Sequence, residues 1–204
     1  MLKIISKTKK RFTDWVSKIY IPSPVEVEGQ RLNLSRDARY LSFNYTPTLS
    51  MIYEISKDNI LYIHGEVGNS DREIVLGHAW KPTFKPIPNL PDPDEDPDDP
   101  RTIEGNEITN KYFENTFKNV QSIINENQSF FASLHQVANI YVLGHSLSAV
   151  DIDYFKEILK KINTDKVCWR ISFFGEKELD RHQATINKLG ISGNNVSFCE
   201  IQRF

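Results

Sequence analysis

The chain has 204 residues, of which 39% are hydrophobic and 25% are charged, and its formal net charge is -2. This composition is typical of an ordinary globular domain, and the small charge gives no general attraction to nucleic acid or to an anionic membrane. No stretch approaches the roughly 18 to 20 apolar residues of a membrane span, and the N-terminus lacks the apolar core and cleavage site of a signal peptide. We therefore predict a single cytoplasmic domain over residues 1–204, with no nucleic acid and no membrane as partner.

Residues 1–20 are predicted to form an amphipathic helix. Four apolar side chains share one face of this helix: Phe12, Trp15, Val16 and Ile19. Its basic residues lie mostly on other faces, a pattern that also occurs in helices that bind membrane surfaces or nucleic acid. A helix packed on a sheet has the same pattern, and we prefer this interpretation. Residues 21–38, which contain Pro22, Pro24 and Gly29, are predicted to be a connector.

Strand and helix patterns alternate through the rest of the chain. Six short runs of apolar and β-branched residues, bounded by turn residues, predict strands: RYLSFN, NILYIHG, EIVLGH, NIYVLGH, VCWRISFF and NVSFCEI. Helical periodicity fills residues 47–57, much of 107–135, 149–162 and 176–189. Apolar strands separated by helices predict an α/β fold of the Rossmann type, a mostly parallel sheet with helices on both faces.

One segment interrupts this alternation. Residues 89–100 contain four prolines and six acidic residues, a composition that cannot form a core. A flap or a cation site is an alternative, but we predict that residues 86–104 are an acidic, proline-rich mobile loop. Cys168 and Cys199 fall within predicted strands without CxxC spacing, so we expect buried thiols rather than a disulfide or a zinc site.

Several polar residues stand where predicted strands end. In an open α/β sheet, ligands bind beyond the carboxyl ends of the strands. Three predicted strands end on a histidine beside a glycine: His64 with Gly65, His78 with Gly77, and His145 with Gly144. Asn44 reaches the same edge from RYLSFN, and its amide can orient a carboxamide or a water molecule because it both donates and accepts hydrogen bonds. We predict that Asn44 and His64 share a pocket.

Structural roles can account for some of the same residues. Thr46 before Pro47 fits an N-cap and first-turn pair that stabilises the next helix without any ligand. Ser148 and Asp151 fit a capping box. A lone histidine at a strand end is more often a satisfied turn residue than a catalyst.

Four motifs in order resemble one known family. The segments FNYTPTLSMIY, LYIHG, VLGH and VLGHSLSAVDIDYF, over roughly residues 40–160, resemble the AbiH abortive-infection family of bacterial phage-defence proteins and, more distantly, sirtuin-like NAD-binding domains. The sirtuin-like resemblance implies that Asn44 lies near the nicotinamide ribose, that His64 is a base, and that the turn of Gly144, Ser146 and Leu147 contacts the adenosine half of NAD. The catalytic residues would then be Asn44 and His64. The expected NAD contacts are Phe43, Thr46, Gly65, Gly77, His78, Gly144, His145, Ser146, Leu147 and Asp151.

The sequence departs from the sirtuin pattern in three ways. Thr46 stands where sirtuins usually have an aspartate, and two cysteines cannot form the four-cysteine zinc ribbon of the deacetylating members. There is also no Gly-x-Gly segment to hold a pyrophosphate. The chain thus resembles a family member without the first strand and glycine-rich turn, an element that a second copy or a partner chain would supply.

These observations lead to three hypotheses. The first is cleavage of the nicotinamide–ribose bond of NAD in phage defence, with Asn44 and His64 as catalytic residues and no metal. The second is a non-catalytic module that binds a nucleotide or a partner. The third, ranked last, is metal-dependent hydrolysis by His64, His78 and His145 together with Asp151 or Asp153.

Overall fold

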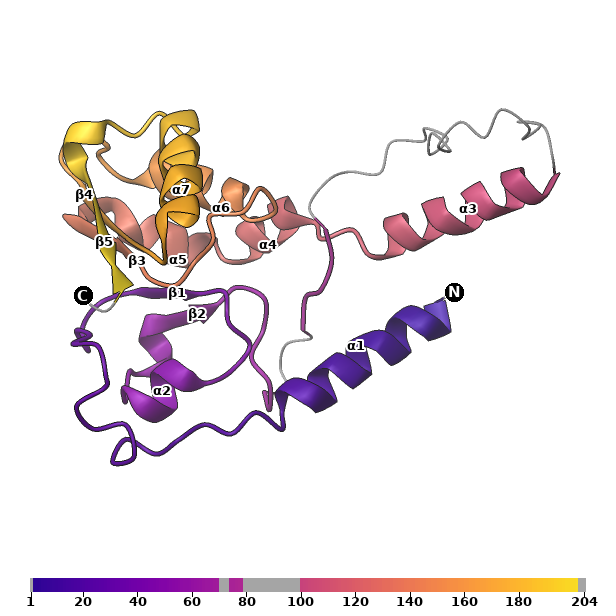
Figure 1. Cartoon of the computed structure of the whole chain (residues 1–204), viewed down its shortest axis with the longest axis horizontal. Coiled ribbons are helices and arrows are strands. Elements are labelled where there is room, and N and C mark those ends of the chain that lie inside the picture. The colour runs from indigo at the N-terminus through magenta and orange to yellow at the C-terminus, as the bar shows by residue number, and fades with distance from the viewer. Residues whose placement is uncertain (1, 70–73, 79–99, 202–204) are drawn as a thin grey trace. The chain divides into compact units, whose positions relative to one another are not determined.

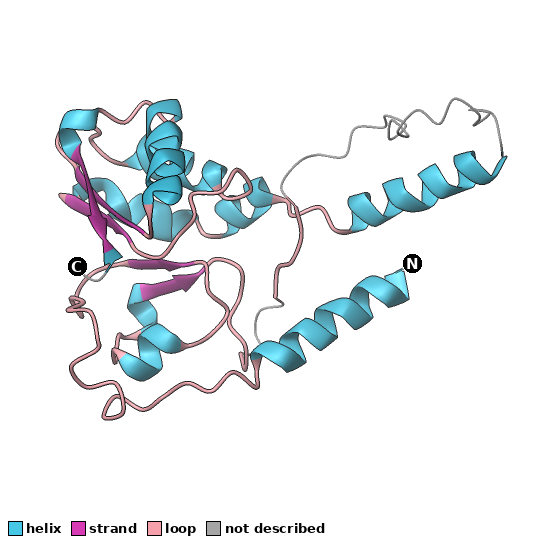
Figure 2. Ribbon diagram, viewed as in Figure 1, coloured by secondary structure: helices cyan, strands magenta, loops and turns pink. Residues whose placement is uncertain are grey.

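The computed structural model describes residues 2–69, 74–78 and 100–201. Helices and parallel strands alternate, so the predicted α/β class of Rossmann type is confirmed (Figures 1 and 2). The chain forms two compact units. Unit 1 comprises Met1–Tyr20, Asn44–Thr46 and His64–Asn119, and unit 2 comprises Ile21–Phe43, Pro47–Ile63 and Val120–Phe204. That all 204 residues fold as one domain stays a prediction.

All strands in the described part of the chain belong to unit 2 and pair in parallel. In one sheet, β1 (Tyr40–Ser42) pairs with β2 (Ile60–Tyr62), and Ser42 lies opposite Tyr62. In the other, β4 (Cys168–Phe173) lies between β3 (Asn139–Val142) and β5 (Val196–Glu200). The parallel pairing was expected, but the described strands form two short sheets rather than one.

Unit 2 has five α-helices among its described residues: α2 (Thr48–Ile52), α4 (Val120–Glu126), α5 (Gln128–Ala132), α6 (Ile152–Lys161) and α7 (Glu176–Lys188). Short 3-10 turns occupy Lys57–Asn59, Ser133–Gln136 and Gly193–Asn195. Its largest fully buried side chains include Trp169, Tyr154, Phe131 and Ile171. Burial of large apolar side chains from α5, α6 and β4 is the main favourable term for this unit.

Burial alternates along β4. Trp169 and Ile171 are buried, whereas Cys168 and Arg170, which alternate with them, are exposed. Side chains alternate between the two faces of a strand, so one face of β4 meets the core at these positions. Both cysteines are free thiols, but the exposed Cys168 and the partly buried Cys199 do not fit the expectation of buried thiols.

Three predicted elements need correction. The described part of EIVLGH, residues 74–78, forms no strand and makes only an isolated bridge between His78 and Phe117. The helical pattern over residues 107–135 is broken, because residues 116–119 leave the helix where that bridge forms. The helix predicted for residues 47–57 ends at Ile52, shortly before Glu54 takes a positive φ of 54°.

Unit 1 contains α1 (Leu2–Val16) and α3 (Pro100–Asn115). Most of the predicted acidic loop lies outside the described residues, but its last part, from Pro100 onward, is the first turn of α3. Proline is well tolerated in a first helical turn because the amide there needs no intrahelical partner. The prediction of a loop is therefore wrong for residues 100–104. Of the helices in the described part of the chain, none combines the length and apolarity that crossing a bilayer requires.

The N-terminal helix is confirmed, but its predicted apolar face is only partly buried. Val16 is buried, and the ring of Phe12 packs edge-on against Tyr45 with 5.1 Å between centroids. In contrast, Trp15 is 63% exposed and Ile19 is 43% exposed. The contact of Phe12 with Tyr45 joins α1 to the segment that contains Asn44.

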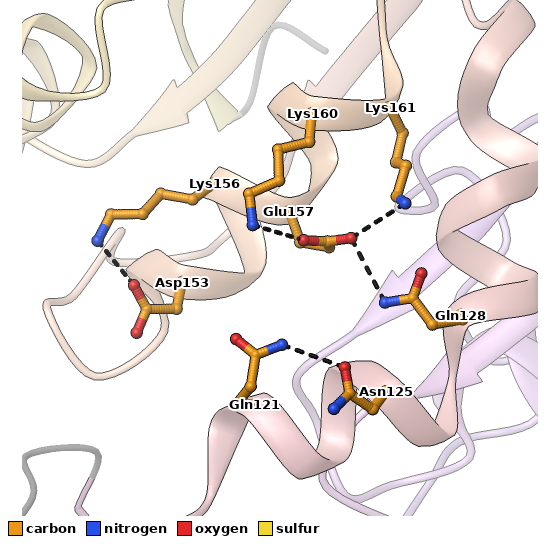
Figure 3. Close-up of polar contacts among 8 residues, drawn as sticks. All are labelled: Gln121, Asn125, Gln128, Asp153, Lys156, Glu157, Lys160 and Lys161. Atoms are coloured by element: carbon orange, nitrogen blue, oxygen red, sulfur yellow. Dashed lines mark hydrogen bonds and ion pairs between the residues drawn. The ribbon is translucent and has the colours of Figure 1, made fainter.

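A buried carboxylate ties α6 to α5. Glu157 is buried and receives Lys160 Nζ at 3.0 Å, Lys161 Nζ at 3.3 Å and Gln128 Nε2 at 3.4 Å (Figure 3). Burial alone would raise the pKa of Glu157, but the hydrogen bonds from Lys160, Lys161 and Gln128 outweigh it and hold the pKa below its usual value. Glu157 is therefore ionised in the folded protein at neutral pH.

Glu157→Gln is expected to lower the free energy of unfolding by about 1 to 3 kcal/mol at pH 7, since it removes hydrogen bonds to a buried charge. A carboxylate whose pKa is lowered by folding stabilises the folded state at pH values above its unfolded pKa. This stabilisation is lost as the pH falls through the folded pKa. The difference in free energy of unfolding between the variant and wild type should therefore shrink below about pH 4.5. Urea unfolding at pH 7 and pH 3.5 measures both effects.

The matched control is Asp153→Asn in the same helix, which removes an exposed ion pair with Lys156 of 2.7 Å between Nζ and Oδ1. Exposed pairs contribute only about 0 to 1 kcal/mol. Equal losses in the two variants would contradict the special role of Glu157.

Candidate functional site

In unit 1, the segments that follow β1 and β2 are joined by hydrogen bonds. Val67 N donates to Tyr45 O at 2.8 Å, and Tyr45 Oη donates to Val75 O at 3.0 Å. Val75 N in turn donates to His64 O at 2.9 Å, and the rings of Tyr45 and His64 are 6.3 Å apart. Asn44, the neighbour of Tyr45, and His64 thus lie on segments that contact each other. Asn44 is exposed and His64 is buried, and a pocket shared by the two stays a prediction.

His64 is hydrogen-bonded to a lysine that no sequence motif marks. Lys118 Nζ lies 3.2 Å from His64 Nε2, and the two residues are only 4% and 6% exposed. A lysine in its usual ammonium form only donates hydrogen bonds, so with Lys118 in that form Nε2 is the acceptor and the ring proton is assigned to Nδ1. Glu66, two residues after His64, is also buried. Burying the Lys118 side chain costs free energy unless it is paired, and the His64 ring supplies one partner.

Gly77 and His78 hold the segment that carries Lys118. His78 N donates to Thr116 O at 3.2 Å, and Lys118 N donates to His78 O at 2.7 Å. His78 Nε2 donates to Phe113 O at 3.0 Å. A Cβ added to Gly77 would lie 1.9 Å from Thr116 O, so only glycine permits this approach. These contacts give both residues a structural role, while their roles as NAD contacts stay untested.

Two other predicted contacts lie near the same segments. Gly65 has a φ of 88°, a left-handed conformation that suits glycine at the turn after β2. Thr46 is not the N-cap of α2, because Pro47 takes that position and no side chain caps the helix. The predicted capping role of Thr46 is therefore wrong.

In unit 2, a second group of predicted residues surrounds His145. The ring of Phe43 lies 4.2 Å from the His145 ring, and that of Phe155 lies 5.3 Å from it. His145 Nδ1 accepts a hydrogen bond of 2.9 Å from Leu147 N, which leaves the imidazole proton on Nε2, 3.7 Å from Asp151 Oδ2. Phe43, His145, Leu147 and Asp151 are thus brought together.

The loop after β3 is tied to β4 and to the start of α6. Gly144 N donates to Ser172 Oγ at 2.8 Å, and Gly144 has a φ of 60°. Ser148 Oγ donates to Asp151 Oδ2 at 3.3 Å, and Asp151 is the N-cap residue without a side-chain cap. The predicted capping box of Ser148 and Asp151 is therefore wrong, since the two side chains bond to each other. Ser146, in the same loop, is exposed.

His182 of α7 is a buried polar residue that the sequence analysis does not single out. It is 0% exposed, and within the described residues neither ring nitrogen makes a hydrogen bond of good geometry, although the main chain of Ser146 interacts with the ring and acts to raise its pKa. Burial lowers the pKa of His182; Glu178, with Oε1 3.9 Å from Nε2, opposes this shift, and His145 and Arg181 add to it. His182 is therefore neutral in the folded protein.

His182→Phe is expected to remove a loss of stability in acid. A histidine with a lowered pKa in the folded state costs stability as the pH falls below its unfolded value of 6.5, because the unfolded chain binds the proton more readily. The variant should unfold at the wild-type urea concentration or above it at pH 7.5, since the unpaired ring nitrogens disappear. Between pH 6.5 and pH 5, its free energy of unfolding should fall less than that of wild type. His135→Phe, at an exposed histidine, serves as the control, and parallel pH curves for the His182 variant and wild type would contradict the expectation.

The comparison with known proteins identifies the family. A family model described as bacteriophage abortive infection AbiH matches residues 1–173. The chain belongs to the AbiH family. No curated protein and no solved structure matches it. The match of this AbiH chain extends beyond the motifs of residues 40–160 and includes α1 and all of β4. Family membership assigns the chain to phage abortive infection, while its sirtuin-like relationship stays a prediction.

The histidines of this AbiH chain lie in different surroundings. His64 and His78 belong to unit 1 and His145 to unit 2. Over the described ranges, no group of three or more histidine, cysteine, aspartate or glutamate residues is arranged to hold a metal ion. Metal-dependent hydrolysis by the three histidines therefore gains no support from the AbiH structure.

Proposed function

We propose that this AbiH protein acts in phage defence by cleaving the nicotinamide–ribose bond of NAD. The observation that carries the proposal is the joining of the segments that contain Asn44 and His64 through Tyr45 and Val75. The strand register supports it further. Ser42 lies opposite Tyr62, and Asn44 and His64 each follow their strand's last residue by two positions. Both residues therefore follow the carboxyl ends of paired parallel strands, where α/β folds bind ligands.

The reaction needs one proton acceptor and no redox partner. A water oxygen bonds to C1′ of the ribose as the C1′–nitrogen bond breaks, and the electron pair of that bond returns to the nicotinamide ring. Nicotinamide leaves as a neutral molecule, and the water proton passes to His64. The Asn44 amide orients the nicotinamide carboxamide or the water. A well-placed base contributes roughly 10²- to 10⁴-fold to the rate.

The test is incubation of the purified chain with NAD, followed by chromatographic measurement of nicotinamide and ADP-ribose. Cleavage by water predicts the two products in equal amounts, at a rate proportional to protein concentration. A heat-unfolded sample provides the blank. Nicotinamide release no faster than in the blank, in both the wild type and the Lys118→Met variant described below, would overturn the proposal.

The burial of His64 and the absence of a Gly-x-Gly segment favour a second candidate, a module that binds a nucleotide or a partner without catalysis. Calorimetry and thermal unfolding with NAD and with ADP-ribose separate the two candidates. A binding module should be stabilised by ligand in proportion to the logarithm of its concentration, without product formation. No heat and no stabilisation at millimolar ligand would leave a protein partner as the remaining ligand class.

A further inference from the structure

His64, the proposed base, is buried, and one of its ring nitrogens is hydrogen-bonded to Lys118. His64 is buried, and its Nε2 lone pair accepts the hydrogen bond from Lys118 Nζ, with 3.2 Å between the two nitrogens. Nδ1 carries the ring proton, as derived above, so it has no lone pair to offer. An imidazole in this state cannot accept a proton from water at either nitrogen. The structure therefore holds His64 in a state without base activity.

The main chain on both sides of this contact is held in place. Lys118 N donates to His78 O at 2.7 Å, and His78 N donates to Thr116 O at 3.2 Å, so residues 116–118 are fixed to His78. On the other side, His64 O accepts from Val75 N at 2.9 Å. Residues 75–78 thus connect the main chain at His64 to the main chain at Lys118, within unit 1. The hydrogen bond between Lys118 and His64 is a property of the folded unit rather than of one flexible surface side chain.

From these contacts we propose that Lys118 keeps the site in an inactive resting state, and that displacement of residues 116–118 activates it. This inference rests on the proposed function, because it assigns regulation to the same site. Displacement breaks the contact between Lys118 Nζ and His64 Nε2, so the Nε2 lone pair becomes available to the reaction. These residues pair with His78 in an isolated bridge and not in a continuous strand ladder, so their displacement breaks no sheet.

The test compares Lys118→Met with wild type. Methionine has a similar length but cannot donate a hydrogen bond, so we expect nicotinamide release to rise at least about tenfold, because a hydrogen bond to a charged group is lost. Lys118→Arg keeps a donor and should remain near the wild-type rate. The matched control is Lys111→Met, at an exposed lysine of α3 that pairs with Glu107, and it should have no effect. A rate for Lys118→Met equal to wild type, or lower, would overturn the proposal.

A second measurement does not depend on activity. Nitrogen-15 spectra of labelled histidine distinguish the two ring nitrogens, and the His64 signals are those missing in His64→Gln. In wild type we expect a protonated Nδ1 and an unprotonated Nε2; in Lys118→Met the proton should redistribute toward Nε2. A wild-type His64 with its proton on Nε2 would overturn the proposal even if Lys118→Met fails to fold. If no variant releases nicotinamide, the proposed function is wrong, and the spectra alone decide whether Lys118 holds His64.

Discussion

His64→Gln is expected to slow nicotinamide release while the protein stays folded, by about 10²- to 10⁴-fold relative to protein in which His64 has been freed from Lys118. Glutamine retains an acceptor, since its side-chain oxygen can receive the hydrogen bond from Lys118, so no buried ammonium is left without a partner. It cannot take up a proton at neutral pH, and the base is lost. The initial rate at saturating NAD, at equal concentrations of folded protein, measures the effect.

Three further variants make this result specific. His64→Ala should lose activity and also stability, because the hydrogen bond between Lys118 Nζ and the His64 ring is lost. His135→Gln changes an exposed histidine and should keep the wild-type rate. In Lys118→Met with His64→Gln, the rate should fall to that of His64→Gln alone. Equal rates for Lys118→Met with and without His64→Gln would remove His64 from the mechanism.

Gly77→Ala is expected to lower the free energy of unfolding by about 3 kcal/mol or more. Gly77 has a φ of 147°, which residues with a Cβ rarely adopt, and the added Cβ would lie 1.9 Å from Thr116 O and 3.0 Å from Thr116 C. Both atoms belong to the main chain, so the residues around Thr116 must move. Urea unfolding measures the loss.

Gly68→Ala is the matched control for backbone strain. Gly68 also belongs to unit 1 and has a φ of 84°, but in the described chain nothing lies within 4 Å of a Cβ added there. It should cost only about 1 to 2 kcal/mol, the usual cost of a left-handed conformation for a residue with a Cβ. Losses of equal size in the two variants would show that the contact with Thr116 has no energetic importance.

The sequence predicts the strands better than the segments between them. Five of the six predicted strands form, because each run has both β-branched or apolar residues and a parallel neighbour. The described part of EIVLGH has the same local pattern and fails, since its only strand-type pairing is the isolated bridge between His78 and Phe117. Helix ends were less predictable: local propensity does not show that Pro47, rather than Thr46, would occupy the N-cap of α2.

The candidate site could be predicted only where strand ends define it. The proximity of the Asn44 and His64 segments follows from parallel pairing of β1 and β2, which the sequence pattern indicates. Lys118 contacts His64 across 54 positions of sequence and lies within a stretch of helical periodicity, so no local pattern relates the two. His182 likewise appears as an ordinary member of α7, and only packing reveals that it is fully buried.

The sequence separation between His64 and Lys118 matters during protein synthesis. At translation rates of about 5 to 20 residues per second, the ribosome makes Lys118 roughly 3 to 10 s after His64. The His78–Phe117 bridge must also wait for this part of the chain, so unit 1 cannot finish folding earlier. The proposed restraint on His64 can therefore form only after residues 116–118 have been made, later than the segments that contain Asn44 and His64.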